Sequence, residues 1–384
     1  MKNIHVLVAS AMWDHDQLRY RRHRLAEYLN ALPETEAVIW LCPSAVRASE
    51  QLIPLKNGIS QWVVSDVLPH RLFRFTRFID CFYRQKMQTF FERLRAFNGR
   101  FYLWYTFPGY PLLASSWRWQ AVIYDCSDLW TAPISGRQSL LSNLRRAVIG
   151  RSEQRIVRRA TRIYCTSDGL HDTLIRRYQL SERRPRTLEN GVAFDAFAAP
   201  AAQEMPLPEA IHEPILGYIG GIKPKLDFSL ISEAATRHPE WNFLFVGPDR
   251  TGGSAAFQQL IARKNVHWLG SIPPAQVPGY VRAIQVGIMP YKPSLYNAAV
   301  FPLKLFEFLA AGKPVVGTGL PSTAKYAEEG VYVHLEHSSP AAFTAACERL
   351  LAGNGRKMAA QRQMLAQRQD WQMIFARMTA FLIR

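Results

Sequence analysis

The most specific segment of the chain is residues 300–318, which read VFPLKLFEFLAAGKPVVGT. The pattern predicts a loop and then a helix that carries Lys304 and Glu307 three residues apart, on one face near the helix start. Unpaired N–H groups at a helix start suit a phosphate, Lys304 adds a charge for a diphosphate, and Glu307 can accept hydrogen bonds from vicinal ribose hydroxyls. A Gly-Lys-Pro turn at 312–314 ends the helix before the next strand. The alternative is an ordinary Lys/Glu pair on the surface of an amphipathic helix.

The rest of the chain alternates short apolar runs with helical patterns. Most of the runs are apolar throughout, which is expected for parallel strands that are buried on both faces. The sequence therefore predicts an α/β protein with doubly wound sheets. The expected strands are 4–9, 37–42, 101–105, 121–124, 162–166, 215–220, 243–247, 266–269, 286–289 and 314–318.

The length of 384 residues predicts two domains, because one domain usually takes roughly 100 to 200 residues. Residues 198–214 are rich in Ala and Pro and lack periodicity, which indicates a linker. We therefore expect a first domain at 1–195, a linker at 196–214, a second domain at 215–365 and a terminal helix at 366–384.

The composition excludes several classes of protein. Charged residues make up 20% of the chain and the AVILMFWYC set 48%, which excludes a disordered or collagen-like chain. No apolar run approaches the roughly 18 residues typical of a membrane span, and the opening residues are expected to form the first strand and not a signal peptide. Five scattered cysteines without a CxxC pair indicate buried thiols in a reducing cytoplasm, and neither a disulfide scaffold nor a cysteine-based zinc site.

The net charge of +17 predicts an anionic partner, for which nucleic acid, a phosphosugar and a membrane surface all qualify. Residues 1–195 carry 29 Lys and Arg against 17 Asp and Glu, a net of +12. Residues 196–384 carry 18 against 13, a net of +5. The basic excess therefore belongs mainly to the first half.

Two basic stretches account for much of that excess. Residues 71–100 hold eight basic and two acidic residues, and their aromatic and aliphatic residues recur at helical spacing: Phe75, Phe78, Ile79, Phe82 and Tyr83. This pattern predicts a helix or helix pair whose aromatic face and cationic rim suit an anionic membrane, or else a helix packed on its own domain. Residues 137–162 hold eight Arg against one Glu and predict an amphipathic helix with its charge on a solvated face; the apolar positions are Leu140, Leu141, Leu144, Val148 and Ile156.

Several segments in a fixed order resemble the nucleotide-sugar glycosyltransferases of the GT-B fold, especially their large retaining group. LENGVAFD at 188–195 is similar to the segment that closes their N-terminal domain, and LGYIGG at 216–221 to the first strand and glycine loop of their C-terminal domain. Asp370-Trp371 resembles the start of the helix that returns to the N-terminal domain. Three more segments fall in the family's order: FLFVGP at 243–248, NVHWLGSIPPAQVPGYV at 265–281 and VGIMPY at 286–291.

The resemblance implies two Rossmann-like domains that face each other across a cleft, with the acceptor bound by 1–195 and a UDP-sugar by 215–365. It implies no metal and no cofactor, and the His residues show no metal-binding spacing. It assigns nucleotide-sugar binding to Gly220, Gly221, Lys223, Tyr291, Pro302, Leu303, Lys304 and Glu307.

Two departures shift the closer resemblance. The large retaining group carries a second glutamate eight residues before Glu307, where this chain has Ala299, and its usual Arg and Lys after the glycine loop are replaced here by Lys223 and Lys225. The chain is therefore more similar to the xanthan-type glucuronosyltransferases and the teichuronic-acid transferases. In the former a Ser-Asp-Gly segment carries the catalytic base, and Asp128 matches it.

Asp128 suits that role chemically, because an acceptor hydroxyl needs a positioned base to take its proton. It follows an apolar strand, at the edge of a sheet where α/β proteins bind ligands. Leu129 replaces the glycine of the family pattern. Asp125 is a rival for the same role, and a turn or helix-capping carboxylate is the alternative reading.

The acceptor side is expected to lie after the first strand. Asp14-His15-Asp16 formally matches a DxD metal motif, but we interpret it as an acceptor loop in which His15 contacts substrate. The basic run that follows, from residue 17 to 24, is expected to begin a helix, and Arg19 and Arg22 are candidates to hold an acceptor diphosphate bidentately. A basic surface helix is the alternative.

These expectations combine into one leading hypothesis: a cytoplasmic, monomeric transferase at the inner face of the membrane. It would move a sugar, with glucuronic acid as one candidate, from a UDP-sugar to a lipid-diphosphate-linked saccharide of a surface polysaccharide. A sugar epimerase or phosphorylase of the same fold is an alternative. A nucleic-acid-binding protein is a further one, although the sequence lacks a nucleic-acid-binding signature.

Overall fold

The computed structural model describes residues 1–15, 18–46, 50–68, 71–136, 139–199, 205, 207–353 and 355–382. The chain forms two compact units, the first mainly Met1–His15, Arg19–Pro133 and Gln138–Leu188, and the second mainly Glu189–Arg384. The predicted linker falls partly on 200–204 and 206, outside the described residues. The four predicted segments, and the return of the last helix to the first domain, stay predictions.

The first unit is built on an eight-stranded sheet in the order β3-β4-β2-β1-β5-β6-β7-β8. β3 is antiparallel to β4, and the other pairs are parallel. The central strand β1 is buried along all but its first residue, and its buried residues include the polar Asn3 and His5. The strands are β1 Lys2–Val8, β2 Thr35–Ser44, β3 Ile53–Pro54, β4 Ser60–Ser65, β5 Gly99–Tyr105, β6 Ala121–Cys126, β7 Arg162–Cys165 and β8 Pro185–Thr187.

Helices follow most of these strands, and polar caps mark where two of them begin. Ser167 Oγ accepts the Leu170 N–H at 3.0 Å before α5, and Ser139 Oγ accepts the Ser142 N–H at 3.1 Å before α4. The α-helices are α1 Arg21–Ala31, α2 Asp80–Lys86, α3 Gln88–Leu94, α4 Leu140–Arg159 and α5 Asp168–Tyr178, with 3-10 turns η1 Arg71–Phe75 and η2 Pro111–Ser115.

The second unit holds a six-stranded parallel sheet in the order β11-β10-β9-β12-β13-β14. Numbered within the unit this is 3-2-1-4-5-6, the Rossmann order, in which the chain changes direction between the first and fourth strands. That switch point lies between β9 and β12. The strands are β9 Ile215–Ile219, β10 Asn242–Val246, β11 Val266–Trp268, β12 Val286–Pro290, β13 Val315–Thr318 and β14 Tyr332–Leu335.

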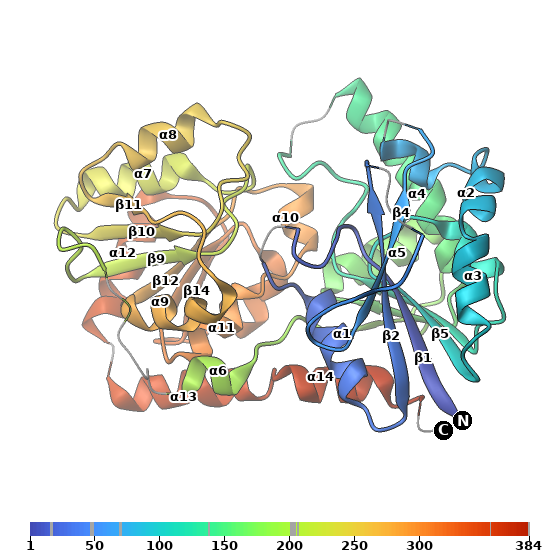
Figure 1. The fold of residues 1–384 in the computed structure, drawn as a ribbon. Helices are drawn as coiled ribbons and strands as arrows, with labels where there is room; N and C mark the ends of the chain where they lie inside the picture. The colour runs from blue at the N-terminus through green and yellow to red at the C-terminus, as the bar shows by residue number, and fades with distance from the viewer. Residues whose placement is uncertain are drawn as a thin grey trace. The chain divides into compact units, whose positions relative to one another are not determined.

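The helices of the second unit cover both faces of its sheet, as Figure 1 shows. α7 and α12 pack together and against β12, whereas α9 packs against β9, and α11 against β12 and β13. The helices are α6 Phe194–Ala198, α7 Phe228–Arg237, α8 Ala255–Ile261, α9 Val277–Ala283, α10 Leu295–Ala299, α11 Lys304–Ala310, α12 Pro340–Ala352, α13 Arg356–Gln367 and α14 Trp371–Thr379, with 3-10 turns η3 Pro274–Gln276 and η4 Pro321–Tyr326.

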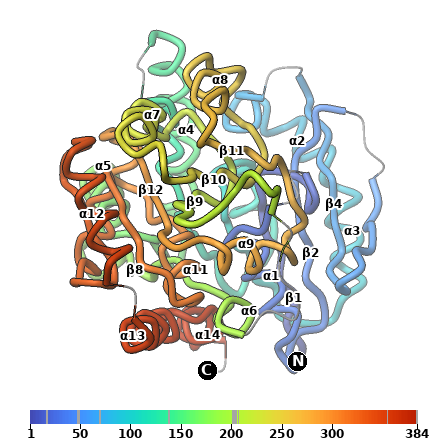
Figure 2. Tube along the Cα trace, turned by 90° about the vertical axis from the view of Figure 1, so that its left-hand side faces the viewer, coloured from blue at the N-terminus to red at the C-terminus, as the bar shows by residue number. Residues whose placement is uncertain are grey.

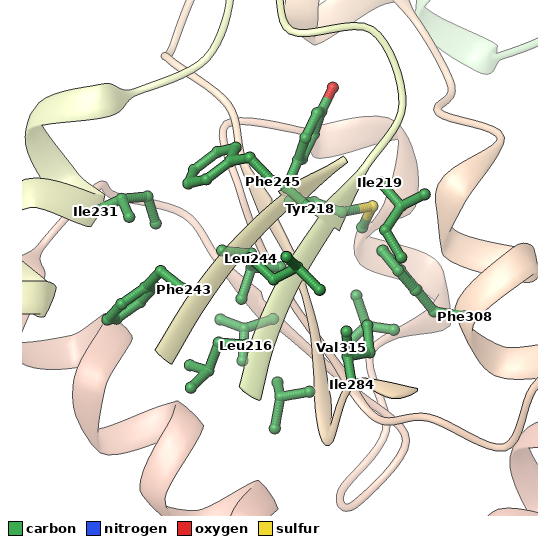
Figure 3. Packing of buried hydrophobic residues seen from close by; sticks show 14 of the residues in the cluster. Leu216, Tyr218, Ile219, Ile231, Phe243, Leu244, Phe245, Ile284, Phe308 and Val315 are labelled. Atoms are coloured by element: carbon green, nitrogen blue, oxygen red, sulfur yellow. The ribbon is translucent and has the colours of Figure 1, made fainter. Parts of the chain in front are cut away.

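A continuous apolar core between these layers fixes the place of α11. Phe308 of α11 lies beside Ile219 and Val315 (Figure 3), and all three side chains are buried. A Cβ atom at Gly287 of β12 would lie 2.6 Å from the Phe308 ring, so only glycine lets the ring pack this close to the strand. The helix that carries Lys304 and Glu307 is therefore held tightly over the sheet.

The predicted α/β class is confirmed, and each of the ten predicted strands is present with its ends within two residues. Four strands were not predicted: β3, β4, β8 and β14. They are short or lie towards the sheet edges, where fewer apolar residues are needed.

Candidate functional site

The loops that leave β9 and β12 meet at the switch point of the second sheet, the place where α/β proteins bind ligands. Gly220 and Gly221 follow β9 directly, and Tyr291 follows β12. Gly220 has a φ of +134°, which side-chain-bearing residues rarely adopt, and its N–H donates to Val246 O at 2.7 Å. The glycine loop is thus hydrogen-bonded to the neighbouring strand. Because Gly220 and Gly221 have no side chains, they do not cover the backbone of the loop.

Lys304 reaches this glycine loop from α11. Its Nζ atom lies 4.8 Å from the centre of the Tyr218 ring, a cation–π contact, and the Tyr218 hydroxyl donates to Gly221 O at 3.1 Å. A Cβ atom at Gly220 would lie 2.5 Å from Lys304 Nζ. The ammonium group therefore occupies the space that the glycine leaves open, directly over the loop.

Glu307 lies one helical turn after Lys304 and is half-buried. Burial raises the pKa of the Tyr291 hydroxyl well above its usual value; Tyr218 and Glu307 raise it further, and Lys304 opposes them. Glu307 thus belongs to the same first turn of α11 as Lys304. One carboxylate and one ammonium group therefore lie in the first turn of α11, and the ammonium group lies over the glycine loop. Their roles towards a ribose and a diphosphate stay predictions.

Two more lysines follow the glycine loop. Lys225 Nζ lies 4.9 Å from the centre of the Tyr291 ring and 5.5 Å from that of Tyr296, and Lys223 is half-buried. Pro302 is buried and Leu303 half-buried in the turn that leads into α11. The donor-side residues predicted from the sequence thus lie in the β9 loop, at the end of β12 and at the start of α11.

In the first unit, the two carboxylates that are candidates for the catalytic base, Asp125 and Asp128, have different surroundings. Asp125 is 1% exposed, and the Arg21 Nε–H group lies 2.9 Å from one of its oxygens and 3.0 Å from the other. Asp128 is half-buried two residues beyond the end of β6, in a turn where its carbonyl oxygen accepts the Trp130 N–H at 2.9 Å. The Asp125 carboxylate is therefore committed to a buried ion pair, whereas Asp128 retains access to solvent.

The predicted acceptor residues lie after β1. His15 is exposed, and Arg19 Nη2 pairs with Asp14 at 3.1 Å, with its guanidinium carbon 5.5 Å from the Trp13 ring centre. Arg22 lies 4.3 Å over the Tyr20 ring. The helix begins at Arg21, later than predicted, because the backbone of Tyr20 is extended. Asp16 lies outside the described residues.

The residues that the structure describes include neither a metal-binding group of side chains nor a membrane-spanning helix. Among those residues no group of three or more His, Cys, Asp or Glu side chains is placed to hold a metal ion. Of the helices that they form, none combines the length and apolarity that a membrane span requires.

Comparison with known proteins identifies the family. Residues 213–353 match the family described as glycosyl transferases group 1. The chain is also 50% identical, over 377 residues, to TuaH of Bacillus subtilis (strain 168), whose name assigns it to teichuronic acid biosynthesis as a glycosyltransferase; the match covers 97% of this chain and 95% of TuaH. This chain is a group 1 glycosyltransferase.

Solved structures of other glycosyltransferases share its fold. Sucrose-phosphate synthase of Thermosynechococcus elongatus superposes with a TM-score of 0.75 at 17% identity, over 100% of this chain and 98% of that one. HepE of Anabaena, solved in complex with UDP-glucose, superposes with a TM-score of 0.69 at 15% identity over the whole of both chains. The predicted GT-B fold and the predicted family are confirmed.

Two residues that matter for these sites in the structure, Tyr218 and Arg21, are not predicted from the sequence. Tyr218 supplies the ring beneath Lys304, and the only signal is an aromatic residue two positions before the glycine loop. Arg21 excludes Asp125 from solvent, but the two residues lie 104 positions apart, and no local pattern joins them.

Proposed function

We propose that this glycosyltransferase takes its sugar from a UDP-sugar bound at the switch point of the second unit. The single observation that carries the proposal is the Lys304 ammonium group over the Gly220 loop, at the ends of β9 and β12, with Glu307 in the same first turn of α11. The structural neighbour HepE was solved with UDP-glucose, which supports the same donor class here.

The chemistry of the leaving group explains why these residues are suited to the donor. When the anomeric C–O bond breaks, the electron pair goes to the diphosphate of UDP, and negative charge grows there. The Lys304 ammonium group lies over the glycine loop, with Lys223 and Lys225 following it, so positive charge is already in place. Glu307 accepts hydrogen bonds from the ribose hydroxyls and selects a ribonucleotide.

In this proposal Asp128 is the base on the acceptor side. It takes the proton of the acceptor hydroxyl while that oxygen forms its bond to the anomeric carbon. The role requires a carboxylate that substrate can reach, which Asp128 offers and the buried Asp125 does not. Direct displacement by a base-activated hydroxyl inverts the anomeric centre.

We further propose that the acceptor is a lipid-diphosphate-linked saccharide at the inner face of the cell membrane. Arg19, Arg22 and the exposed His15 lie at the start of the first unit and are suited to its diphosphate. Arg19 Nη1 is buried and, within the described part of the chain, has no hydrogen-bond partner, so the guanidinium group retains a donor for an anion. The name of TuaH, which refers to teichuronic acid biosynthesis, supports a polysaccharide as the product. In this proposal the polysaccharide belongs to the cell surface, and glucuronic acid is one candidate sugar.

The test begins with a calorimetric screen of UDP-sugars and GDP-sugars, followed by UDP release with a lipid-diphosphate-linked saccharide and NMR of the linkage formed. We expect binding of UDP-sugars only and UDP release that requires the acceptor and persists in EDTA. Strict dependence on Mn²⁺, or conversion of a UDP-sugar to its epimer without acceptor, would contradict the proposal.

A further inference from the structure

The first turns of α4 carry a set of leucines that the protein does not bury. Leu140, Leu141 and Leu144 are 89%, 79% and 57% exposed. Burial in α4 begins only at Ile149, and the second half of the helix packs against η1 and η2. The amphipathic helix predicted for this stretch is present, but its leucines project into solvent. We call residues 139–148 the α4 arm.

The α4 arm is helical although most of its residues are exposed, with Ser142 and Val148 half-buried. Ser139 and Ser142 cap it reciprocally: Ser139 N–H donates to Ser142 Oγ at 2.8 Å, and Ser142 N–H donates to Ser139 Oγ at 3.1 Å. In Figures 1 and 2 this green helix starts at the top of the picture, and in Figure 1 its start lies beyond the ends of the strand arrows of the first sheet. A capped helix that presents adjacent exposed leucines is expected to have an apolar partner.

The charge of α4 identifies the kind of partner. Arg145, Arg146 and Arg151 are exposed, and residues 139–152 contain no acidic residue. Glu153, the single acidic residue of α4, is 2% exposed and accepts the Tyr178 hydroxyl at 2.6 Å, so it points inward. Leucines beside uncompensated arginines match an anionic lipid surface, where the apolar side chains enter the acyl boundary and the arginines meet headgroups.

A second copy of the chain does not match this arm, because two α4 arms that meet face to face would bring their arginines together. Nucleic acid would match the arginines but leave the leucines exposed. We propose that the α4 arm is the element by which this enzyme docks on an anionic bilayer. The inference rests on the proposed function only in that a lipid-linked acceptor requires the enzyme to work at a membrane.

The structure also restricts the alternative surface predicted at 71–100. Phe75, Ile79 and Tyr83 are buried in the first unit, so they do not contact lipid. Phe78 and Phe82 remain 67% and 53% exposed beside Arg77 and Arg84. They form a smaller surface with which the α4 arm can be compared directly.

The experiment is flotation of the full-length protein with vesicles of phosphatidylcholine alone or with about 30 mol% phosphatidylglycerol, which gives the vesicle the negative surface potential that attracts basic residues. The arm variant replaces Leu140, Leu141 and Leu144 by Ser; a second variant is Arg145→Gln/Arg146→Gln. Matched controls are Met364→Ser, an exposed apolar residue of the second unit, and Phe78→Ser/Phe82→Ser.

We expect wild-type protein to bind anionic vesicles and to be released by salt. The leucine variant should partition at least about tenfold less, and the arginine variant about 25-fold less at low salt, or roughly fivefold per residue. Met364→Ser should bind as wild type, and all variants should keep the circular dichroism and UDP affinity of wild type, because these side chains are exposed. Leu144→Trp should show a blue-shifted emission on anionic vesicles only.

Wild-type binding by the leucine variant, or loss confined to the phenylalanine variant, would overturn the proposal. Analytical ultracentrifugation tests the alternative occupant. If wild-type protein self-associates and the leucine variant does not, the docking proposal is overturned and the α4 arm is assigned to contact with a second copy of the chain. Vesicle binding and UDP affinity are measured separately. If the α4 arm does not bind vesicles, the proposed donor site is unaffected, and if UDP does not bind, the docking proposal is unaffected.

Discussion

Replacing Gly220 by Ala tests the donor site through a single methyl group. The added Cβ would lie 2.5 Å from Nζ and 2.7 Å from Cε of Lys304, so the lysine must leave its place over the loop. A hydrogen bond to a charged group contributes about 1.5–3 kcal/mol. If Lys304 holds the diphosphate, the Kd for UDP should rise about 10- to 150-fold.

The same substitution also strains the backbone, because Gly220 has a φ of +134°. Such strain costs about 1–3 kcal/mol of the free energy of unfolding. Gly58→Ala in the first unit is the matched control: Gly58 has a φ of +80°, and its added Cβ would meet Asn30 Nδ2 at an ordinary 3.4 Å. It should lower stability and leave the Kd for UDP unchanged.

A double-mutant cycle separates displacement of the lysine from other effects. In a Lys304→Ala background the methyl group has nothing to displace, so Gly220→Ala should change the Kd for UDP by less than about threefold. The assay is isothermal titration calorimetry with UDP on the four proteins, with Lys357→Ala as an exposed-lysine control. An unchanged Kd for Gly220→Ala, or the same loss in both backgrounds, would refute the reasoning.

Three further predictions concern other residues. Asp128→Asn should lower kcat by about 10²- to 10⁴-fold with the Kd for UDP nearly unchanged, whereas Asp172→Asn should not; a fully active Asp128→Asn enzyme would remove Asp128 from the mechanism. Asp125→Asn breaks the buried ion pair with Arg21 and should lower the free energy of unfolding by about 3–5 kcal/mol, and an unchanged denaturation midpoint would count against that pair. Tyr218→Leu should raise the Kd for UDP by about 3- to 20-fold, since it removes the ring beneath the donor-site lysine. Tyr218→Phe keeps the ring, loses only the hydrogen bond to Gly221 O and should raise the Kd less; equal effects would contradict the cation–π contact.

The sheets could be predicted because parallel strands must be apolar on both faces. β9 and β12 are buried along their whole lengths, and their sequences ILGYI and VGIMP have no charged residue. β4 was missed because Ser60 and Gln61 interrupt its apolar character, and β14 because its last three residues are only half-buried. A run of apolar residues thus indicates a strand that is buried on both faces. The run is interrupted, and the strand is missed, where the strand is only partly buried.

The site was predictable only where its residues are close in sequence. Lys304 and Glu307 follow from spacing on one helix, but the contact of Lys304 with Tyr218 joins residues of different elements. Periodicity likewise predicts that Leu140 and Leu144 share a face of α4, but it does not reveal whether another element covers that face. Such facts depend on the packing of distant segments.

The central claim is that the switch point of the second unit binds the nucleotide of a UDP-sugar through Lys304 and Glu307. Calorimetric titration of wild type and Glu307→Ala with UDP and 2′-deoxy-UDP tests it most directly. We predict that wild type binds UDP at least about tenfold more tightly than the deoxy compound, and that Glu307→Ala binds both equally weakly, because a carboxylate that accepts from ribose hydroxyls contributes about 1.5–3 kcal/mol. Equal affinity of wild type for the two nucleotides, or unchanged discrimination in Glu307→Ala, would contradict the claim.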